Sequence, residues 1–325
     1  MLPYLKKFTD VIDKSTLAKL SKVEYKGRLQ RLTVITGKDV DWIIHNCKDV
    51  QKKLKSYAPT TQKGYINTVL TLFKYTKDLK KKQPDSYKCW FDALNKINLV
   101  VEAKYDNIEP SKKQLETYVS WDDIIKKRDT LNNNSQEYLL LSMYTMIPPA
   151  RADMNHVKIY HREPSDKEIE KQPNYLIIKG DVMRLIYNEF KSRGRKIQRY
   201  EKELPDNLKV VITNSLENHP RDYLIVSPRT GEPYENAATY TKYFDRMLHK
   251  IFDKAVTINT LRHSFVNALP HTLTPGERDA IARELMHDER TMQRYRLILP
   301  EGNRQECKMV CNYESKESKT KKTNN

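Results

Sequence analysis

The clearest pattern in the sequence is the helical spacing of apolar side chains between residues 60 and 79. One face of this segment carries four apolar residues that fit the helical period: Ile66, Val69, Leu70 and Phe73. Such spacing predicts an α-helix, with Thr60 or Thr61 as its N-cap. Two further segments, residues 22–35 and 39–54, are also expected to be helical. The first hundred residues therefore predict a small domain built of helices.

The second half of the chain combines helices with a short β region. Ser120 followed by Asp123 is typical of a helix start. The apolar helix that begins at Ser135 is expected to end at Pro148, because proline cannot continue the backbone hydrogen bonds. Apolar and β-branched residues predict three short antiparallel strands, at 174–180, 183–190 and 197–204.

Helical patterns return after the strands, over residues 237–252 and 260–269. Another helix is expected after Thr274, because Pro275 suits the first helical position and Glu277 the third. We therefore predict a mainly α protein with a small antiparallel β-sheet, an α+β fold. Its expected parts are a helical domain, a charged linker, a second domain and a basic tail, at 1–103, 104–118, 119–302 and 303–325.

The chain is strongly basic. It has 59 Lys and Arg against 42 Asp and Glu, a formal net charge of +17. A surplus of this size favours a polyanionic partner, most often nucleic acid. A basic surface that only keeps the protein soluble is the alternative. The interleaving of basic residues with Tyr and Trp favours nucleic acid.

Several classes of protein are disfavoured. Four cysteines, at 47, 89, 307 and 311, are too few and too scattered for a disulfide framework, so a reducing compartment is expected. Nothing completes a zinc site around Cys307 and Cys311, so no metal is expected. No segment reaches the roughly 18 apolar residues of a membrane span. The early charges of "MLPYLKKFTD" disfavour a secretory signal. We expect an intracellular, non-secreted protein without a membrane partner. The chain has eight glycines and no phosphate-binding loop, which disfavours a nucleotide cofactor.

Polar residues with catalytic chemistry stand at the ends of the predicted elements. They are Arg151, Lys191, Arg262, His263, His287 and Tyr295. Each has an ordinary interpretation when taken singly. The arginines could hold any phosphate or carboxylate, the lysine could be a solvated turn residue, and the tyrosine could be a packed aromatic with a wet hydroxyl.

Taken together and in this order, three segments resemble the tyrosine recombinase/integrase family. They are "LLLSMYTMIPPARAD", "IYNEFKSRGRK" and "NTLRHSFVNAL" followed by "ELMHDERTMQRYRLI". The resemblance is to phage-integrase-like enzymes, and closest to integrases of DNA viruses and mobile elements. It implies that residues 1–103 are a core-binding domain and that residues 119–302 are a catalytic domain.

The resemblance also implies a reaction. Tyr295 would attack a DNA phosphodiester and become attached to the 3′ phosphate. Arg151, Arg262 and His287 would stabilise the charge on phosphorus, and Lys191 would protonate the leaving oxygen. No cofactor, metal or ATP is implied. The implied partners are double-stranded DNA, three further copies of the chain in a tetramer on DNA, and accessory directionality proteins. The implied outcome is integration of a viral or mobile-element genome.

The sequence departs from the family pattern at Asn259, where the family has His or Lys. An amide cannot accept a proton at neutral pH. The proton of Tyr295 could pass to His287, to water, or to His263, although the family equivalent of His263 is mostly structural. In addition, Asp153 stands two residues after Arg151 rather than three.

Two alternatives to a recombinase stay open on the sequence. One is an enzyme similar to type IB topoisomerases, which shares the nucleophile and the arginines but relaxes supercoils as a monomer. The other is a DNA-binding accessory protein that has lost catalysis, an interpretation that Asn259 makes possible.

Overall fold

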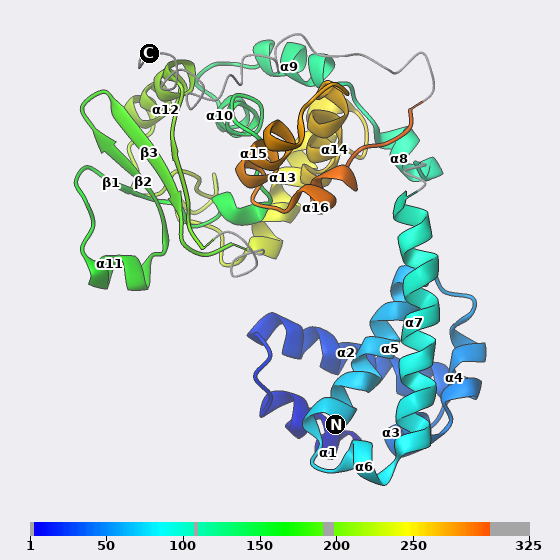
Figure 1. Cartoon of the computed structure of the whole chain (residues 1–325). Helices are drawn as coiled ribbons and strands as arrows, with labels where there is room; N and C mark the ends of the chain where they lie inside the picture. The colour runs from blue at the N-terminus through cyan, green and yellow to red at the C-terminus, as the bar shows by residue number, and fades with distance from the viewer. Residues whose placement is uncertain (1–2, 107–109, 191–197, 300–325) are drawn as a thin grey trace, which may run out of the picture. The chain divides into compact units, whose positions relative to one another are not determined.

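The structure, a computed structural model, describes residues 3–106, 110–190 and 198–299 (Figure 1). The chain forms two compact units, Met1–Asn107 and Ile108–Asn325, which are described separately. It is mainly helical and has one small sheet, so the predicted α+β fold is confirmed. In the described part of the chain, no helix is both long enough and apolar enough to cross a membrane.

The first unit is a bundle of helices. Its elements are α1 (Pro3–Asp13), α2 (Lys19–Thr36), α3 (Val40–His45), α4 (Cys47–Leu54), α5 (Pro59–Tyr75), α6 (Leu79–Lys82) and α7 (Pro84–Asp106). The predicted N-cap at Thr60 or Thr61 is wrong. Ala58 caps α5, because Pro59 has the backbone angle of a first helical residue and needs no hydrogen-bond acceptor for its nitrogen.

Residues 39–54 form two helices rather than the one predicted. Asn46 separates α3 from α4, and both its backbone N–H and its side-chain amide donate to the carbonyl of Trp42, at 2.9 Å each. A short polar side chain that binds the backbone in this way competes with helix continuation. The helical spacing is kept on both sides of the break, which is why the sequence pattern does not reveal it.

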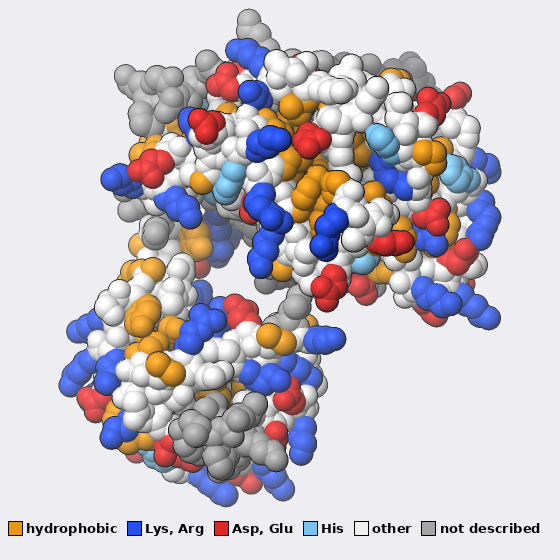
Figure 2. Space-filling model, turned by 180° about the vertical axis from the view of Figure 1, so that it is seen from behind, with side chains coloured by type: hydrophobic (Ala, Val, Ile, Leu, Met, Phe, Trp, Pro, Cys, Tyr) orange, Lys and Arg blue, Asp and Glu red, His pale blue; other side chains and the backbone are white. Residues whose placement is uncertain are grey.

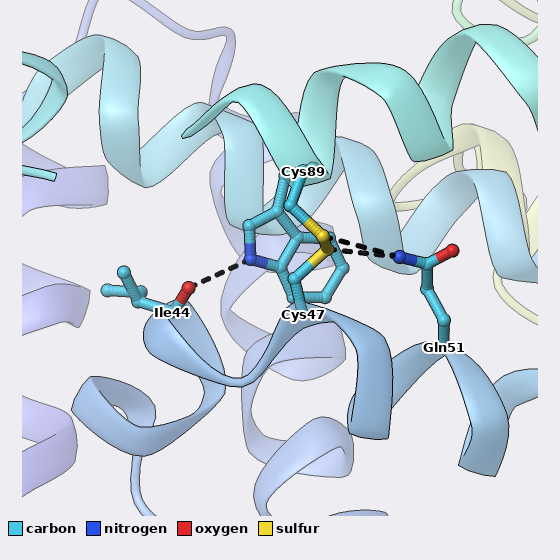
Figure 3. The surroundings of a disulfide bond; sticks show 5 residues. Ile44, Cys47, Gln51 and Cys89 are labelled. Atoms are coloured by element: carbon cyan, nitrogen blue, oxygen red, sulfur yellow. Dashed lines mark hydrogen bonds between the residues drawn. A yellow bond between two sulfur atoms is a disulfide. The ribbon is translucent and has the colours of Figure 1, made fainter. Parts of the chain in front are cut away.

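A disulfide joins α4 to α7 in this unit (Figure 3). Cys47 and Cys89 are bonded, and the amide of Gln51 donates to the sulfur of Cys47 at 3.0 Å. On the next residue of α7, the indole of buried Trp90 donates to the carbonyl of Ile44 at 3.0 Å. The sequence-based expectation of a chain without disulfides is therefore wrong at this pair. The helical packing brings together two cysteines that are 42 residues apart.

The second unit packs helices against a four-stranded sheet. Its helices are α8 (Lys112–Thr117), α9 (Trp121–Asp129), α10 (Gln136–Met143), the 3₁₀ turn η1 (Ala152–Met154), α11 (Asp166–Lys171), α12 (Asp206–Asn218), α13 (Ala237–Phe252), α14 (Ile258–Ala268), α15 (Pro275–Glu284) and α16 (Glu289–Gln293). Its strands are β1 (Lys158–Tyr160), β2 (Asn174–Lys179), β3 (Val182–Tyr187) and β4 (Tyr200–Glu203). Helix α10 ends at Met143, earlier than predicted, and irregular turns lead to Pro148.

The sheet is mixed rather than antiparallel. β2, β3 and β4 pair antiparallel in sequence order, whereas β1 pairs parallel with β2. Parallel neighbours need a crossover connection, and α11 lies within that crossover here. Strand β1 spans only three residues, too short for a recognisable pattern of alternation.

Alternation along the strands separates two apolar layers. Leu176 and Leu185 face the main core of the unit, which α10, α12, α13 and α14 also line. Tyr175, Ile177 and Ile186 face the opposite side, where they pack with Tyr160 and with Ile169 of α11. The sheet is therefore covered on both faces, with the main core on the side toward α14.

Two sequence predictions lie outside the described residues. Lys191 and the basic turn that follows it belong to 191–197, and the predicted basic tail lies in 300–325. Strand β4 begins at Tyr200, within the predicted 197–204 strand.

Candidate active site

Helix α14 carries the central residue of the site. The helix begins with a capping box between Thr257 and Thr260, and Leu261 and Phe265 pack into the core. Arg262 follows Leu261 and is only 1% exposed. A cation buried so completely is costly unless the fold supplies hydrogen-bond acceptors for it.

Those acceptors come from two distant segments. The guanidinium of Arg262 donates to the carbonyl of Pro149 and, at 3.2 Å, to the carbonyl of Leu285. It also contacts Nε2 of His287. Pro149 lies two residues before Arg151, and Leu285 lies two residues before His287. One guanidinium group thus joins α14 to the segment that carries Arg151 and to the segment that carries His287.

The position of His287 depends on how α15 ends. The N–H of Met286 donates to the carbonyl of Arg283 at 2.8 Å, and the N–H of His287 donates to the carbonyl of Ala282 at 2.9 Å. These two bonds define a Schellman motif, which requires a left-handed residue at the position after the cap. Met286 has this conformation, with φ of 57°. Glycine is usual there, so a strained methionine turns the chain and directs His287 into the site.

The imidazole of His287 lies between two guanidinium groups. Its Nδ1 is 3.0 Å from Nη2 of Arg151, and its Nε2 contacts Arg262. Burial and the positive charges of Arg262 and Arg151 lower the pKa of His287 to about 2. The ring is therefore neutral at physiological pH, and a neutral imidazole has only one acceptor nitrogen. Only one of the two guanidinium contacts can be a hydrogen bond at a time, and Nε of Arg262 is buried without a hydrogen-bond partner.

Tyr295 lies against this cluster. The guanidinium carbon of Arg262 is 5.0 Å from the centre of the tyrosine ring, and the ring centres of His287 and Tyr295 are 5.4 Å apart. Burial raises the pKa of the phenol, but the charges of Arg262 and Arg151 and their hydrogen bonds to the side chain lower it. The net result is a pKa below the ordinary value. The two arginines thus favour the phenolate despite its burial.

The backbone of Arg151 is bound by the side chain of a buried tyrosine, Tyr144. The hydroxyl of Tyr144 donates to the carbonyl of Arg151 and lies 3.3 Å from the hydroxyl of Tyr240 on α13. Asp153 accepts a hydrogen bond from the backbone N–H of Arg151 at 3.3 Å. Both contacts fix the backbone of Arg151 and leave its guanidinium turned toward His287.

Of the seven residues singled out in the sequence, the structure brings four together in one cluster: Arg151, Arg262, His287 and Tyr295. Asn259 lies one turn before Arg262 on α14, but it is exposed. Lys191 lies outside the described residues. His263 turns its ring toward the Tyr295 segment, and its Nδ1 is 2.7 Å from the carbonyl oxygen of Tyr295.

Sequence reasoning missed three residues that shape the site. Tyr144, Met286 and Asn267 act on the backbone, through a hydroxyl, a left-handed turn and a side-chain amide respectively. Only Asn267 left a signal, as a polar residue one turn after His263 in an apolar helix. The described residues contain no group of three or more His, Cys, Asp or Glu placed to hold a metal ion.

No family model matches the chain, and no curated protein matches it. Among solved structures, the chain is similar to a crystal structure of XerA recombinase, with 16% sequence identity and a TM-score of 0.40. The similarity covers 92% of this chain and 95% of that chain. A similarity this weak carries no conclusion about function, so the function proposed below rests on the side chains of the site.

Proposed function

We propose that this protein cleaves and rejoins DNA as a tyrosine recombinase, with Tyr295 as the nucleophile. The observation that carries the proposal is the convergence of half-buried Tyr295 and Arg151 with buried Arg262 and His287 in one cluster. Among the described residues, no ion pair joins Arg262 to a carboxylate. A cluster of two guanidinium groups, in which Nε of Arg262 is buried without a hydrogen-bond partner, is suited to binding an anion, and a DNA phosphate has the required charge and geometry.

The proposed reaction begins with attack of the Tyr295 oxygen on phosphorus. A bond forms between the phenol oxygen and phosphorus, and the bond from phosphorus to the 5′ oxygen breaks. The phenol proton goes to a base, and the leaving 5′ oxygen gains a proton, which we assign to Lys191. The product is a 3′ phosphotyrosyl bond that keeps the energy of the original linkage, so rejoining needs no ATP.

The arginines supply the electrostatic part of catalysis. Charge builds on the equatorial oxygens of phosphorus during attack, and donors that are already positioned stabilise it without reorganisation. Loss of one such donor typically costs about 10²–10³ in rate. Arg262 meets this requirement well, because two backbone carbonyls hold its guanidinium in place before substrate arrives.

The proton acceptor is assigned to His287 rather than to Asn259. Asn259 is exposed and cannot accept a proton, whereas His287 lies against the ring of Tyr295 and has an acceptor nitrogen. The pKa of about 2 makes His287 a weak base as long as the charges of the two arginines are not offset. The lowered pKa of Tyr295 also reduces the strength of base that the step needs. An incoming phosphate would favour protonation of His287, because its negative charge offsets the two arginines.

DNA binding is proposed to use both units, residues 1–103 as the core-binding domain and 119–302 as the catalytic domain. Lys and Arg side chains are spread over the visible face of both units (Figure 2). The net charge of +17 should make binding strongly salt-dependent, with a log–log slope of roughly −0.9 per phosphate contacted. The functional assembly is proposed to be a tetramer on DNA with accessory directionality proteins, acting inside cells to integrate a viral or mobile-element genome.

The second candidate is a DNA-binding accessory protein without catalysis. The exposed amide of Asn259 favours it. At this position the family has a residue that transfers a proton, and an amide cannot do so. Under this interpretation the cluster would bind a phosphate without cleaving it.

A nicked suicide duplex separates the two candidates, since release of a short strand traps the covalent intermediate. A recombinase is expected to give a DNA adduct at the peptide that contains Tyr295, and Tyr295→Phe should abolish it. Binding without any adduct would support the accessory protein. Relaxation of a supercoiled plasmid that lacks recognition sites would instead indicate a topoisomerase-like enzyme.

A further inference from the structure

We infer that Asn267 is a positioning residue that holds the segment of Tyr295 against the helix of Arg262. The inference rests on the proposed function for its catalytic consequence, but its structural part stands on two hydrogen bonds. Oδ1 of Asn267 accepts from the backbone N–H of Leu297 at 2.9 Å. Its Nδ2 donates to the carbonyl of His263 at 2.9 Å.

The two bonds fix the orientation of the amide. Only the oxygen can accept from the N–H of Leu297, and only the nitrogen can donate to the carbonyl of His263. Rotation of the amide by half a turn would place like groups against each other and lose both bonds. The hydrogen bond from Asn267 to the carbonyl of His263 therefore orients Oδ1 of Asn267 toward the N–H of Leu297.

His263 makes the second half of the attachment. It lies four residues before Asn267, which places both side chains on one face of α14. Nδ1 of His263 is 2.7 Å from the carbonyl oxygen of Tyr295, and because burial lowers the pKa of His263, the neutral ring must carry its proton on Nδ1 to donate there. The carbonyl of Tyr295 and the N–H of Leu297 are thus both bound to α14.

The tyrosine segment depends on these contacts for its position. Helix α16 ends at Gln293, and residues 296–299 belong to no helix or strand. A third contact lies at the C-terminal end of α14, where the guanidinium of Arg296 donates to the carbonyl of Leu269 at 3.2 Å. The N–H groups of Tyr295 and Arg296 still donate to the carbonyls of Met292 and Gln293, at 2.9 and 3.0 Å, whereas the N–H of Leu297 donates to the side chain of Asn267. From Leu297 on, the segment is therefore held by what it packs against.

The consequence for the site is geometric. Arg262 precedes His263 on α14, so the guanidinium and both attachment points move together as parts of one helix. The contacts to α14 thus place the Tyr295 segment relative to Arg262, in addition to the backbone hydrogen bonds that join Tyr295 and Arg296 to the end of α16. A displacement of about 1 Å in such a site can cost on the order of 10²-fold in rate. Asn267 is therefore expected to act on rate through Tyr295, without touching the substrate.

The test compares Asn267→Ala with a matched control, Asn218→Ala. Asn218 on α12 also donates from its amide to the carbonyl four residues earlier, at 2.7 Å from Asn214, but it lies outside the site. Hydrogen exchange at the amide of Leu297 and the pKa of the Tyr295 phenol are measured, the latter as the difference between each protein and its Tyr295→Phe version. We expect Asn267→Ala to lose protection at Leu297 and to raise the phenol pKa, and Asn218→Ala to change neither.

A second variant guards against misfolding. Asn267→Asp keeps an acceptor for the N–H of Leu297, so it should retain protection there even if the alanine variant unfolds. Unchanged exchange at Leu297 and an unchanged phenol pKa in a folded Asn267→Ala protein would overturn the inference.

Formation of the covalent adduct then measures the catalytic consequence. Asn267→Ala should slow it by about 10²-fold with DNA affinity unchanged. An equal loss of affinity and rate would show that Asn267 contacts DNA and would also overturn the inference. If the wild-type protein forms no adduct but the Leu297 and phenol measurements behave as expected, the proposed function fails and the positioning role stands.

Discussion

The guanidinium carbon of Arg262 lies 5.0 Å from the centre of the Tyr295 ring, on the face of that ring. This contact places a permanent positive charge next to a partly buried phenol. Arg262 itself is held by the carbonyls of Pro149 and Leu285. These two hydrogen bonds keep the guanidinium from turning toward solvent. Folding of the second unit therefore fixes the positive charge beside Tyr295.

Replacement of Arg262 should therefore affect both catalysis and stability. Arg262→Ala is expected to abolish adduct formation while DNA binding stays measurable, because the phosphate contact is strongest in the transition state. It also leaves the two carbonyls without their donor, at a cost of about 1–3 kcal/mol each. Thermal unfolding and a suicide-duplex assay measure the two effects. Equal loss of binding and cleavage would contradict the assigned role.

The pKa of the Tyr295 phenol should respond to the arginines in a defined direction. In the wild-type protein the phenol is expected to ionise below its ordinary pKa of about 10, because the two positive charges outweigh burial. In Arg262→Ala burial remains while one charge is lost, so the pKa should rise. Ultraviolet absorbance of the ionised phenol, with Tyr295→Phe as the blank, measures it. A pKa that does not move would separate Arg262 from the nucleophile.

Stability should fall as the solution is acidified below about pH 6.5, the ordinary pKa of histidine. The folded protein lowers the pKa of His287 to about 2 and also lowers the pKa of His263. The unfolded chain then binds protons that the folded one does not, so the stability present above pH 6.5 is lost progressively toward pH 2. His287→Gln should flatten this dependence in urea unfolding measured across pH. The same slope in both proteins would show that His287 titrates normally in the fold.

Replacement of Met286 by glycine is expected to destabilise the fold less than replacement by alanine, which is the reverse of the usual order within a helix. Loss of the buried methionine side chain costs about 2–5 kcal/mol in either variant. The left-handed backbone at φ of 57° disfavours alanine by roughly 1 kcal/mol more, whereas glycine adopts it freely. Met286→Gly should therefore unfold at higher urea than Met286→Ala. The opposite order would indicate that the turn before His287 has a different conformation.

Reduction of the disulfide should destabilise the first unit. The bond between Cys47 and Cys89 closes a loop across 42 residues, and such a link typically stabilises a fold by about 2–4 kcal/mol. Cys47→Ser with Cys89→Ser, or treatment with a thiol reductant, is expected to lower the unfolding midpoint of that unit. The midpoint of the double variant should not respond to the reductant. A wild-type protein equally indifferent to reductant would mean that the two cysteines are free.

Local features of the fold follow from local sequence. The capping box of Thr274 and Glu277 and the start of α13 at Ala237 could be predicted, because their hydrogen bonds join residues three or four positions apart. Strand β1 and the break at Asn46 could not be predicted. The first depends on a neighbour across the α11 crossover, and the second on a side chain that competes with helical bonds without disturbing the apolar spacing.

The same distinction between local and long-range contacts applies to the candidate site. The sequence by itself determined which chemical groups are available: two arginines, a histidine and a tyrosine in segments that resemble one family. Only the tertiary structure decided that Arg262 reaches a carbonyl 113 residues away, that His287 lies between two guanidinium groups, and that Asn259 is exposed. The physical reason is that each such contact joins segments remote in the chain. Their distance is set by how buried side chains from many elements fill one core, which no local pattern records.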